Sequence, residues 1–209
     1  TQPGKKHLTD TVLNGLFETY GHALQNLGKK RDFGLLHRLD LPVSGLLLVG
    51  RTPKGYDDLR QQFVDRLIEK TYFCFVHGKP KKNGVVEHPI REVRVRGEKT
   101  AQLGPHAQAK NALTKFHLIS SVGKVSLVRC RIITGRLHQI RVHMASLGHP
   151  ILGDFKYGRR SQLDKRLGRD QIGLHAHALH FRQPTQRKKI QLEVPLPTQL
   201  QELAHRLGL

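Results

Sequence analysis

Apolar residues recur with the period of an amphipathic helix in several stretches of the chain. Over residues 10–27 the period is close to 3.6, with Asp10 as a plausible N-cap and Gly28 as a stop. A second helix is predicted over residues 52–66, because Thr52-Pro53 is a typical helix start. Its expected inward side chains are Tyr56, Leu59, Phe63 and Leu67. Further helices are predicted over residues 136–147 and 198–207.

Alternating apolar and polar positions predict strands elsewhere. The predicted strands cover residues 71–77, 112–120, 125–133, 172–181 and 190–194, and two short ones flank a turn at residues 41–45. Residues 78–110 are expected to form a hairpin and a mobile basic loop around residues 97–108. Consecutive hairpins with helices between them indicate an α+β fold, with a mostly antiparallel, bent sheet, flanking helices and a cleft across the sheet.

One stretch combines this pattern with candidate chemistry. Arg38 and Asp40 lie two residues apart between apolar segments, so on an extended backbone their side chains point to the same side. A carboxylate there can act as a nucleophile, as a base or as half of an ion pair. The alternative is a structural aspartate that opens a turn, and this stretch alone favours that interpretation.

Three motifs in a fixed order favour the catalytic interpretation of this stretch. HRLDLPVSGLLLVGRT begins at His37, EKTY begins at Glu69, and TGRLHQIRVH begins at Thr134 and is followed by GHPILGD from Gly148. Together they resemble the signature motifs of the RluA-type RNA pseudouridine synthases, from roughly residue 8 to the C-terminus. The resemblance implies a pseudouridine synthase fold with a central catalytic cleft, and a single catalytic domain over residues 1–209 is expected at this length. The family's first strand has no counterpart, so either it precedes this chain, with or without a leader, or this member lacks it.

The resemblance implies that the protein isomerises uridine to pseudouridine, by breaking the N1–C1′ bond and rejoining the base through C5. It assigns the catalytic carboxylate to Asp40, its counter-charge to Arg136 and stacking on the flipped-out base to Tyr72. Whether Asp40 acts as nucleophile or base stays open, and Tyr72 has the alternative of an ordinary half-buried strand tyrosine. The reaction involves no oxidation or group transfer and so needs no cofactor and no metal. Contacts with RNA are assigned to His37, Arg38, His138, Arg141 and Leu174.

The charge of the chain indicates a polyanionic partner. Lys and Arg total 36 against 16 Asp and Glu, a formal net charge of +20 that is spread along the whole chain. RNA is the first candidate, with ribosomal RNA favoured over transfer RNA, and a ribosomal assembly particle is a further possible partner. An anionic membrane surface is the alternative, but no apolar run is long enough to span a bilayer. DNA is disfavoured because no helix-turn-helix or zinc pattern is visible, and the sequence sets no oligomeric state.

The cysteines argue against a disulfide framework, and the histidines argue against a metal site. Cys74 and Cys130 fall inside predicted strands, which is typical of buried thiols in a reducing compartment, either cytoplasm or mitochondrion. His138 and His143 are five residues apart, whereas zinc-binding pairs on a helix are four apart. A His-x-His pair at residues 175 and 177 has no cysteine or carboxylate set to complete a metal site.

A second function class remains open beside the enzyme. The chain could be an RNA-binding ribosome-assembly factor that keeps the fold without needing catalysis. The high charge favours this alternative, as does Pro42, which stands at a variable family position that is rarely proline. The presence of Asp40, Tyr72 and Arg136 argues against it, because a decayed enzyme would be free to lose them.

Overall fold

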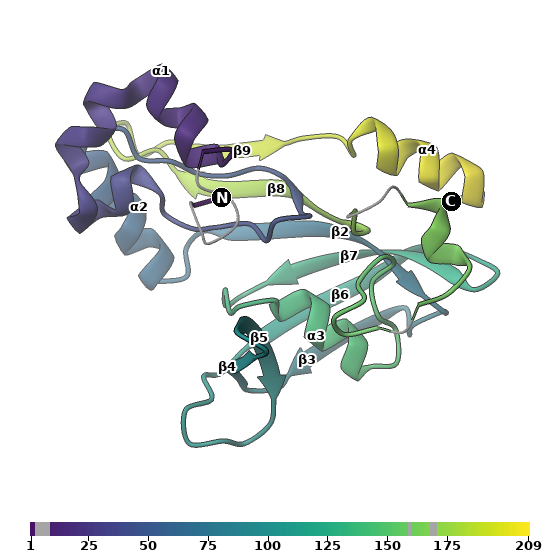
Figure 1. Cartoon of the computed structure of the whole chain (residues 1–209). Coiled ribbons are helices and arrows are strands. Elements are labelled where there is room, and N and C mark those ends of the chain that lie inside the picture. Colours follow the sequence, from purple (N-terminus) through teal and green to yellow (C-terminus); the bar gives the residue numbers. More distant parts are fainter. Residues whose placement is uncertain (3–8, 159, 168–170) are drawn as a thin grey trace. The chain divides into compact units, whose positions relative to one another are not determined.

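The computed structural model describes residues 1–2, 9–158, 160–167 and 171–209 (Figure 1). In chain order its elements are α1 (Val12–Leu27), the 3₁₀ helix η1 (Lys29–Gly34), β1 (Ser44–Gly45), α2 (Pro53–Val64), β2 (Glu69–His77), β3 (Asn83–Glu87), β4 (Ile90–Val95), β5 (Glu98–Leu103), β6 (Leu113–Val122), β7 (Val125–Ile132), α3 (Gln139–Ser146), the 3₁₀ helix η2 (Leu163–Arg166), β8 (Leu174–Arg182), β9 (Lys189–Glu193) and α4 (Thr198–Leu207).

These elements form two compact units. Unit 1 comprises Thr1–Leu41, Leu46–Ile68 and Leu179–Leu192, and unit 2 comprises Pro42–Gly45, Glu69–Ala178 and Glu193–Leu209. The chain therefore leaves unit 1 directly after Leu41, contributes four residues to unit 2, and returns to unit 1 at Leu46. The single catalytic domain stays a prediction.

Unit 1 is built on the two predicted helices. Their apolar stripes pack together, and the buried members of this cluster are Leu24, Leu27, Leu36, Tyr56 and Leu59. Thr52 caps α2 through its side chain, as predicted, and Pro53 occupies its first turn. The N-cap of α1 is Thr11 and not Asp10, because Thr11 and Asn14 bond each other's backbone reciprocally in a capping box. Leu67 is 57% exposed, since α2 ends at Val64.

The strands form a seven-stranded sheet among the described residues. Its order is β1-β8-β2-β7-β6-β3, and β9 also pairs with β8. The pairs β2–β7, β6–β7 and β3–β6 are antiparallel (Figure 1). The short strand β1 pairs with β8 in parallel. The predicted α+β fold with a mostly antiparallel sheet and flanking helices is confirmed. Within unit 2, Leu200 and Leu203 of α4 pack in one core cluster with Phe75 of β2.

Three further local predictions were wrong. Near Asp40 the backbone forms a single bridge between Leu35 and Val49 and the two-residue strand β1, in place of two short strands. The region expected to be a basic loop from residue 97 begins with the strand β5, which pairs with β4 in a separate two-stranded sheet. Finally, α3 begins at Gln139 and not at Arg136, because His138 has a left-handed backbone with φ of 50°.

Candidate active site

A buried amide fixes the turn that carries Arg136. Gln139 is 3% exposed, and its Oε1 accepts hydrogen bonds from the Thr134 hydroxyl (2.7 Å) and from the backbone N–H of Arg136 (3.0 Å). Its Nε2 donates to the carbonyl of Leu113 (3.0 Å), at the start of β6. Because every one of these groups is held by the same side chain, the backbone at Arg136 has a defined position before α3 begins. The sequence alone indicated no role for Thr134 or Gln139.

The guanidinium of Arg136 lies near a second positive charge. Its Nε donates to the carbonyl of Asn111 (3.1 Å), which orients the side chain. Lys70 on β2 is only 8% exposed, and a Cβ on Gly135 would lie 3.3 Å from its Nζ. Burial, and secondly the charge of Arg136, lower the pKa of Lys70 to about 8. Two basic side chains therefore lie close together here, and one of them is buried.

Lys70 belongs to the EKTY motif but received no role of its own from the sequence, although its position carried a signal. Lys70, Tyr72 and Cys74 alternate along β2 and are all buried, so they share one face of the strand. A lysine among buried alternating positions is unusual, because lysine is almost never fully buried without a partner. Tyr72 is 8% exposed and stands opposite Cys130 in the β2–β7 register. Both interpretations of Tyr72 given above are compatible with this burial.

The predicted residues of the first motif lie in unit 1. His37 Nε2 accepts a hydrogen bond from the backbone N–H of Leu48 (2.9 Å), and its ring lies 5.3 Å from that of Phe63. This imidazole therefore connects the two arms of the loop that contains Asp40. Arg38 is exposed and Asp40 is partly exposed. Asp40 belongs to unit 1 and Arg136 to unit 2, so their pairing stays a prediction.

The segment that follows Asp40 is fixed within unit 2. Ser44 and His175 are partners in the β1–β8 pair, and Ser44 Oγ lies 2.8 Å from His175 Nδ1. His175 is 2% exposed, and burial lowers its pKa, which favours the neutral ring that accepts from the serine hydroxyl. A Cβ on Gly45, where φ is +115°, would collide with the carbonyl oxygen of Ala176. Only glycine permits this close approach. The sequence alone does not indicate this contact, because Ser44 and His175 are 131 positions apart.

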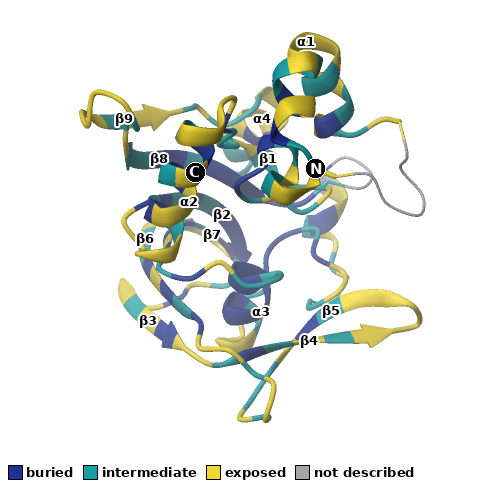
Figure 2. Cartoon of the chain, turned by 90° about the vertical axis from the view of Figure 1, so that its left-hand side faces the viewer, coloured by how far each residue is buried: buried dark blue, intermediate teal, exposed yellow. Residues whose placement is uncertain are grey.

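Two polar residues of α3, Arg141 and His143, are buried, whereas His138, directly before the helix, is partly exposed. Figure 2 shows α3 almost entirely in the buried colour. His143 is fully buried, with Nδ1 2.9 Å from the Thr114 hydroxyl and Nε2 3.1 Å from the carbonyl of His88. Arg141 is 8% exposed and donates to both carboxylate oxygens of Asp154, each at 2.8 Å. Contacts of Arg141 and His138 with RNA stay predictions, as does the pocket-lining role of Leu174, which is 4% exposed in β8.

The buried pair gives a stability prediction. Replacing Asp154 by Asn should lower the free energy of unfolding by about 3–5 kcal/mol, because the guanidinium of Arg141 would stay buried without its counter-charge. Urea denaturation measures the loss. The matched control is Glu92→Gln, which removes the charge of Glu92 from its exposed pair with Lys99 (57% side-chain exposure for each residue). This variant should lower the free energy of unfolding by less than about 1 kcal/mol. Equal losses in the two variants would contradict the structural role of the pair.

The histidines considered for metal binding have other partners. His175 bonds Ser44, and His177 Nδ1 donates to the carbonyl of Val194 (2.7 Å) while its ring stacks on Phe73. Among the described residues, no group of three or more His, Cys, Asp or Glu side chains is arranged to hold a metal ion. The described helices are all too short or too polar to cross a membrane. Cys74 and Cys130 are buried free thiols.

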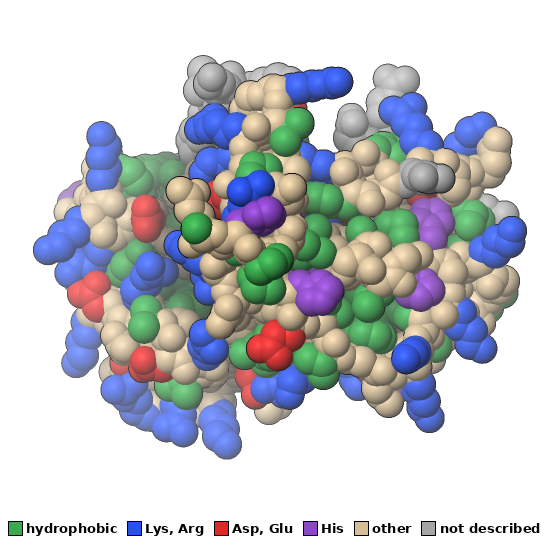
Figure 3. All heavy atoms as spheres, turned by 90° about the horizontal axis from the view of Figure 1, so that it is seen from below, with side chains coloured by type: hydrophobic (Ala, Val, Ile, Leu, Met, Phe, Trp, Pro, Cys, Tyr) green, Lys and Arg blue, Asp and Glu red, His purple; other side chains and the backbone are tan. Residues whose placement is uncertain are grey.

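Positive charge is widely distributed on the surface. In the face drawn in Figure 3, Lys and Arg side chains are spread over the visible area and are more frequent than Asp and Glu, in keeping with the totals of 36 and 16. This distribution suits an extended polyanion better than a single small anion.

Comparison with known proteins identifies the family. Residues 4–146 match the family model described as RNA pseudouridylate synthase. The chain is 34% identical over 205 residues to "Ribosomal large subunit pseudouridine synthase D" of Zymomonas mobilis, and 35% identical over 207 residues to "Uncharacterized RNA pseudouridine synthase YlyB" of Bacillus subtilis. These alignments cover 96% and 98% of this chain but only 64% and 65% of the two relatives' lengths.

A solved structure agrees with the sequence comparisons. "Human RNA Pseudouridylate Synthase Domain Containing 4" superposes with a TM-score of 0.70 at 25% identity, over 90% of this chain and 83% of that one. The family match covers more than half of the chain and includes the first two motifs and most of the third. The chain belongs to the RNA pseudouridylate synthase family.

Proposed function

We propose that this protein isomerises uridine to pseudouridine in structured RNA. The observation that carries the proposal is the pair of cations in unit 2, Lys70 and Arg136, on a scaffold that holds the Arg136 turn through Gln139. Two basic side chains can balance the charge of a catalytic carboxylate. The first motif assigns that carboxylate to Asp40. In this proposal the guanidinium of Arg136 provides the counter-charge of the Asp40 carboxylate.

The proposed reaction needs only groups that the chain contains. Asp40 acts at the sugar as nucleophile or base, the N1–C1′ bond breaks, and the uracil turns so that C5 bonds to C1′. The proton on C5 then leaves and N1 gains one, so the product is an isomer of the substrate. Tyr72 stacks on the base and assists at the C5 proton, and Arg38 occupies the space that the flipped-out base leaves. Flipping costs least where the base is already unstacked, which favours loops and bulges.

Ribosomal RNA is the proposed substrate class. The name of the Zymomonas mobilis relative refers to the ribosomal large subunit, and the net charge of +20 suits a large, highly charged RNA. We place the protein in a reducing compartment, cytoplasm or mitochondrion, in keeping with its two buried thiols.

Mapping pseudouridines tests the proposed function. Ribosomal and transfer RNA are compared from cells with and without this protein, and the loss of one or more pseudouridines in ribosomal RNA is expected. Loss only in transfer RNA would overturn the substrate class while keeping the activity. An unchanged map, with RNA binding intact, would favour the ribosome-assembly factor, for which the net charge of +20 is the supporting observation.

RNA affinity should depend steeply on salt. The protein carries 36 Lys and Arg, and each phosphate contact releases counterions, so log K should fall linearly with log salt concentration. With six or more phosphate contacts, affinity should fall by about a thousandfold between 50 and 200 mM salt. Filter binding or fluorescence anisotropy measures the slope. An affinity that does not change with salt concentration over this range would contradict a binding free energy dominated by phosphate contacts.

A further inference from the structure

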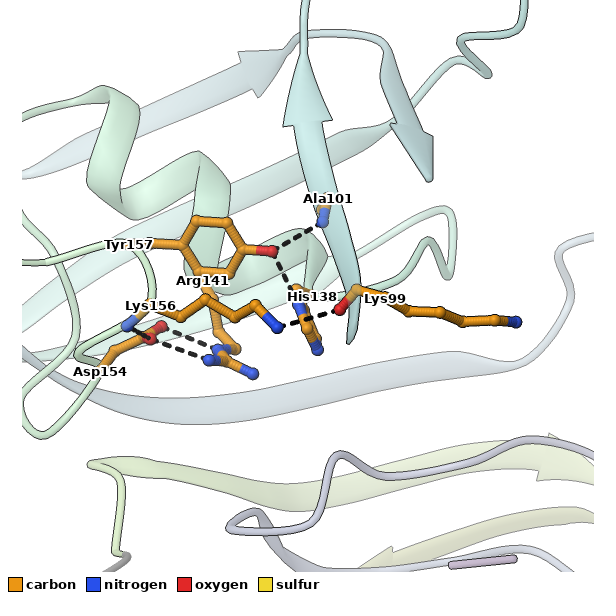
Figure 4. Close-up of polar contacts among 7 residues, drawn as sticks. All are labelled: Lys99, Ala101, His138, Arg141, Asp154, Lys156 and Tyr157. Atoms are coloured by element: carbon orange, nitrogen blue, oxygen red, sulfur yellow. Dashed lines mark hydrogen bonds and ion pairs between the residues drawn. The ribbon is translucent and has the colours of Figure 1, made fainter. Parts of the chain in front are cut away.

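The hydroxyl of Tyr157 connects two parts of unit 2 that are far apart in the sequence. The backbone N–H of Ala101 in β5 donates to this hydroxyl oxygen at 2.8 Å. The same oxygen lies 2.7 Å from Nδ1 of His138. Figure 4 shows the tyrosine directed at both groups from the segment that follows Asp154. A single oxygen thus contacts the β4–β5 hairpin and the turn before α3.

The ring of Tyr157 is held in place independently of its hydroxyl. Arg141 Cζ lies 5.3 Å from the ring centroid, and Arg141 is fixed by its two bonds to Asp154. The ring also packs against an apolar cluster whose buried members are Ile90, Ala101, Ala112 and Val142. Next to it, Lys156 Nζ donates to the carbonyl of Lys99 at 3.0 Å. The contacts of the Tyr157 ring therefore do not depend on the hydroxyl, and removing the hydroxyl should leave the ring in place.

His138 is the residue through which the hydroxyl reaches Arg136. It follows Arg136 by two positions and has the left-handed backbone that starts α3. Because a non-glycine residue in this conformation carries strain, the side-chain bond to Tyr157 helps to hold the turn. The turn is thus fixed from inside by Gln139 and from the hairpin side by Tyr157.

We infer that Tyr157 is a positioning residue whose hydroxyl couples the β4–β5 hairpin to the turn that carries Arg136. Its role in the reaction rests on the proposed function, in which Arg136 orients the catalytic carboxylate. Loss of the hydroxyl removes the oxygen through which Ala101 and His138 are linked. The turn then becomes more mobile, and the guanidinium of Arg136 is held less precisely. Small displacements of a group that orients a reacting centre reduce rates strongly. RNA affinity should change little, because no charge is removed.

Tyr157→Phe tests the inference, with Tyr20→Phe as the control. Tyr20 is an exposed tyrosine of α1 in unit 1, so the control makes the same chemical change far from this network in the chain. Hydrogen exchange should become faster at Ala101 and also at residues 136–138 in Tyr157→Phe, and remain as in wild type in the control. The single-turnover rate of pseudouridine formation should fall on the order of tenfold, with RNA affinity within about twofold of wild type.

A second variant separates coupling from simple loss of stability. His138→Asn keeps a residue that tolerates the left-handed backbone but removes the imidazole. If the hydroxyl acts through His138, the double variant should be no slower than the more impaired single variant, as a double-mutant cycle would show. Additive rate losses, or faster exchange at Ala101 alone, would overturn the inference, and so would a wild-type rate in Tyr157→Phe. If the wild-type protein makes no pseudouridine, the proposed function fails, while the exchange at residues 136–138 still decides the coupling.

Discussion

Replacing Asp40 by Asn should abolish pseudouridine formation while leaving the fold and the RNA affinity nearly intact. The two side chains are almost the same size, so packing in unit 1 should be preserved, including the contacts of His37 with Leu48 and Phe63. The amide can neither attack the sugar nor remove a proton from it. We expect the single-turnover rate to fall by about a hundred- to ten-thousandfold, which is the range associated with losing a proton-transfer group.

The control for Asp40 is another aspartate of unit 1. Asp57 pairs with Arg31 on the surface with 56% of its side chain exposed, so Asp57→Asn should leave the rate unchanged. Circular dichroism and RNA binding establish that both variants are folded and competent. A rate near wild type in Asp40→Asn would remove Asp40 as the catalytic carboxylate and with it the assignment of the motif.

The second large effect is expected at Arg136. A guanidinium presents a planar fork that matches a carboxylate, and an ammonium does not, so Arg136→Lys keeps the charge but loses the orientation. The rate should fall on the order of a hundredfold in Arg136→Lys and further in Arg136→Ala. RNA affinity should change only modestly, since at most one of 36 basic side chains is lost. Arg131→Lys on β7, where the side chain is 48% exposed, is the matched control and should retain full activity.

The pH dependence of these variants provides an independent measurement. Arg136 is one of the two causes that lower the pKa of Lys70 to about 8, after burial. Removing its charge in Arg136→Ala should therefore raise the pKa of Lys70 above 8, as NMR titration of the lysine side chain would show. A pKa of Lys70 that stays at its wild-type value would contradict the proximity of the two cations.

Local sequence determined the helices and most of the strands. The period of α1, the Thr52-Pro53 start of α2 and the bounds of α4 depend on neighbouring residues, so a window of one or two turns contains the information. The motifs also carried the family assignment and the candidates Asp40, Tyr72 and Arg136. Two of the wrong predictions concerned local features as well, namely the cap of α1, which is Thr11 and not Asp10, and the start of α3, which is Gln139 and not Arg136.

Only the tertiary structure decided which polar side chains are structural. Arg141 and His143 look like surface residues in a polar stretch, but their partners Asp154, Thr114 and His88 come from other segments and make their burial possible. Ser44 meets His175 across 131 positions, and Ala101 meets Tyr157 across 56. No pattern of hydrophobic and polar residues encodes such pairs, because the pattern specifies which face of an element is buried and not which side chain lies opposite. A buried polar group is stable only when that opposite side chain satisfies it.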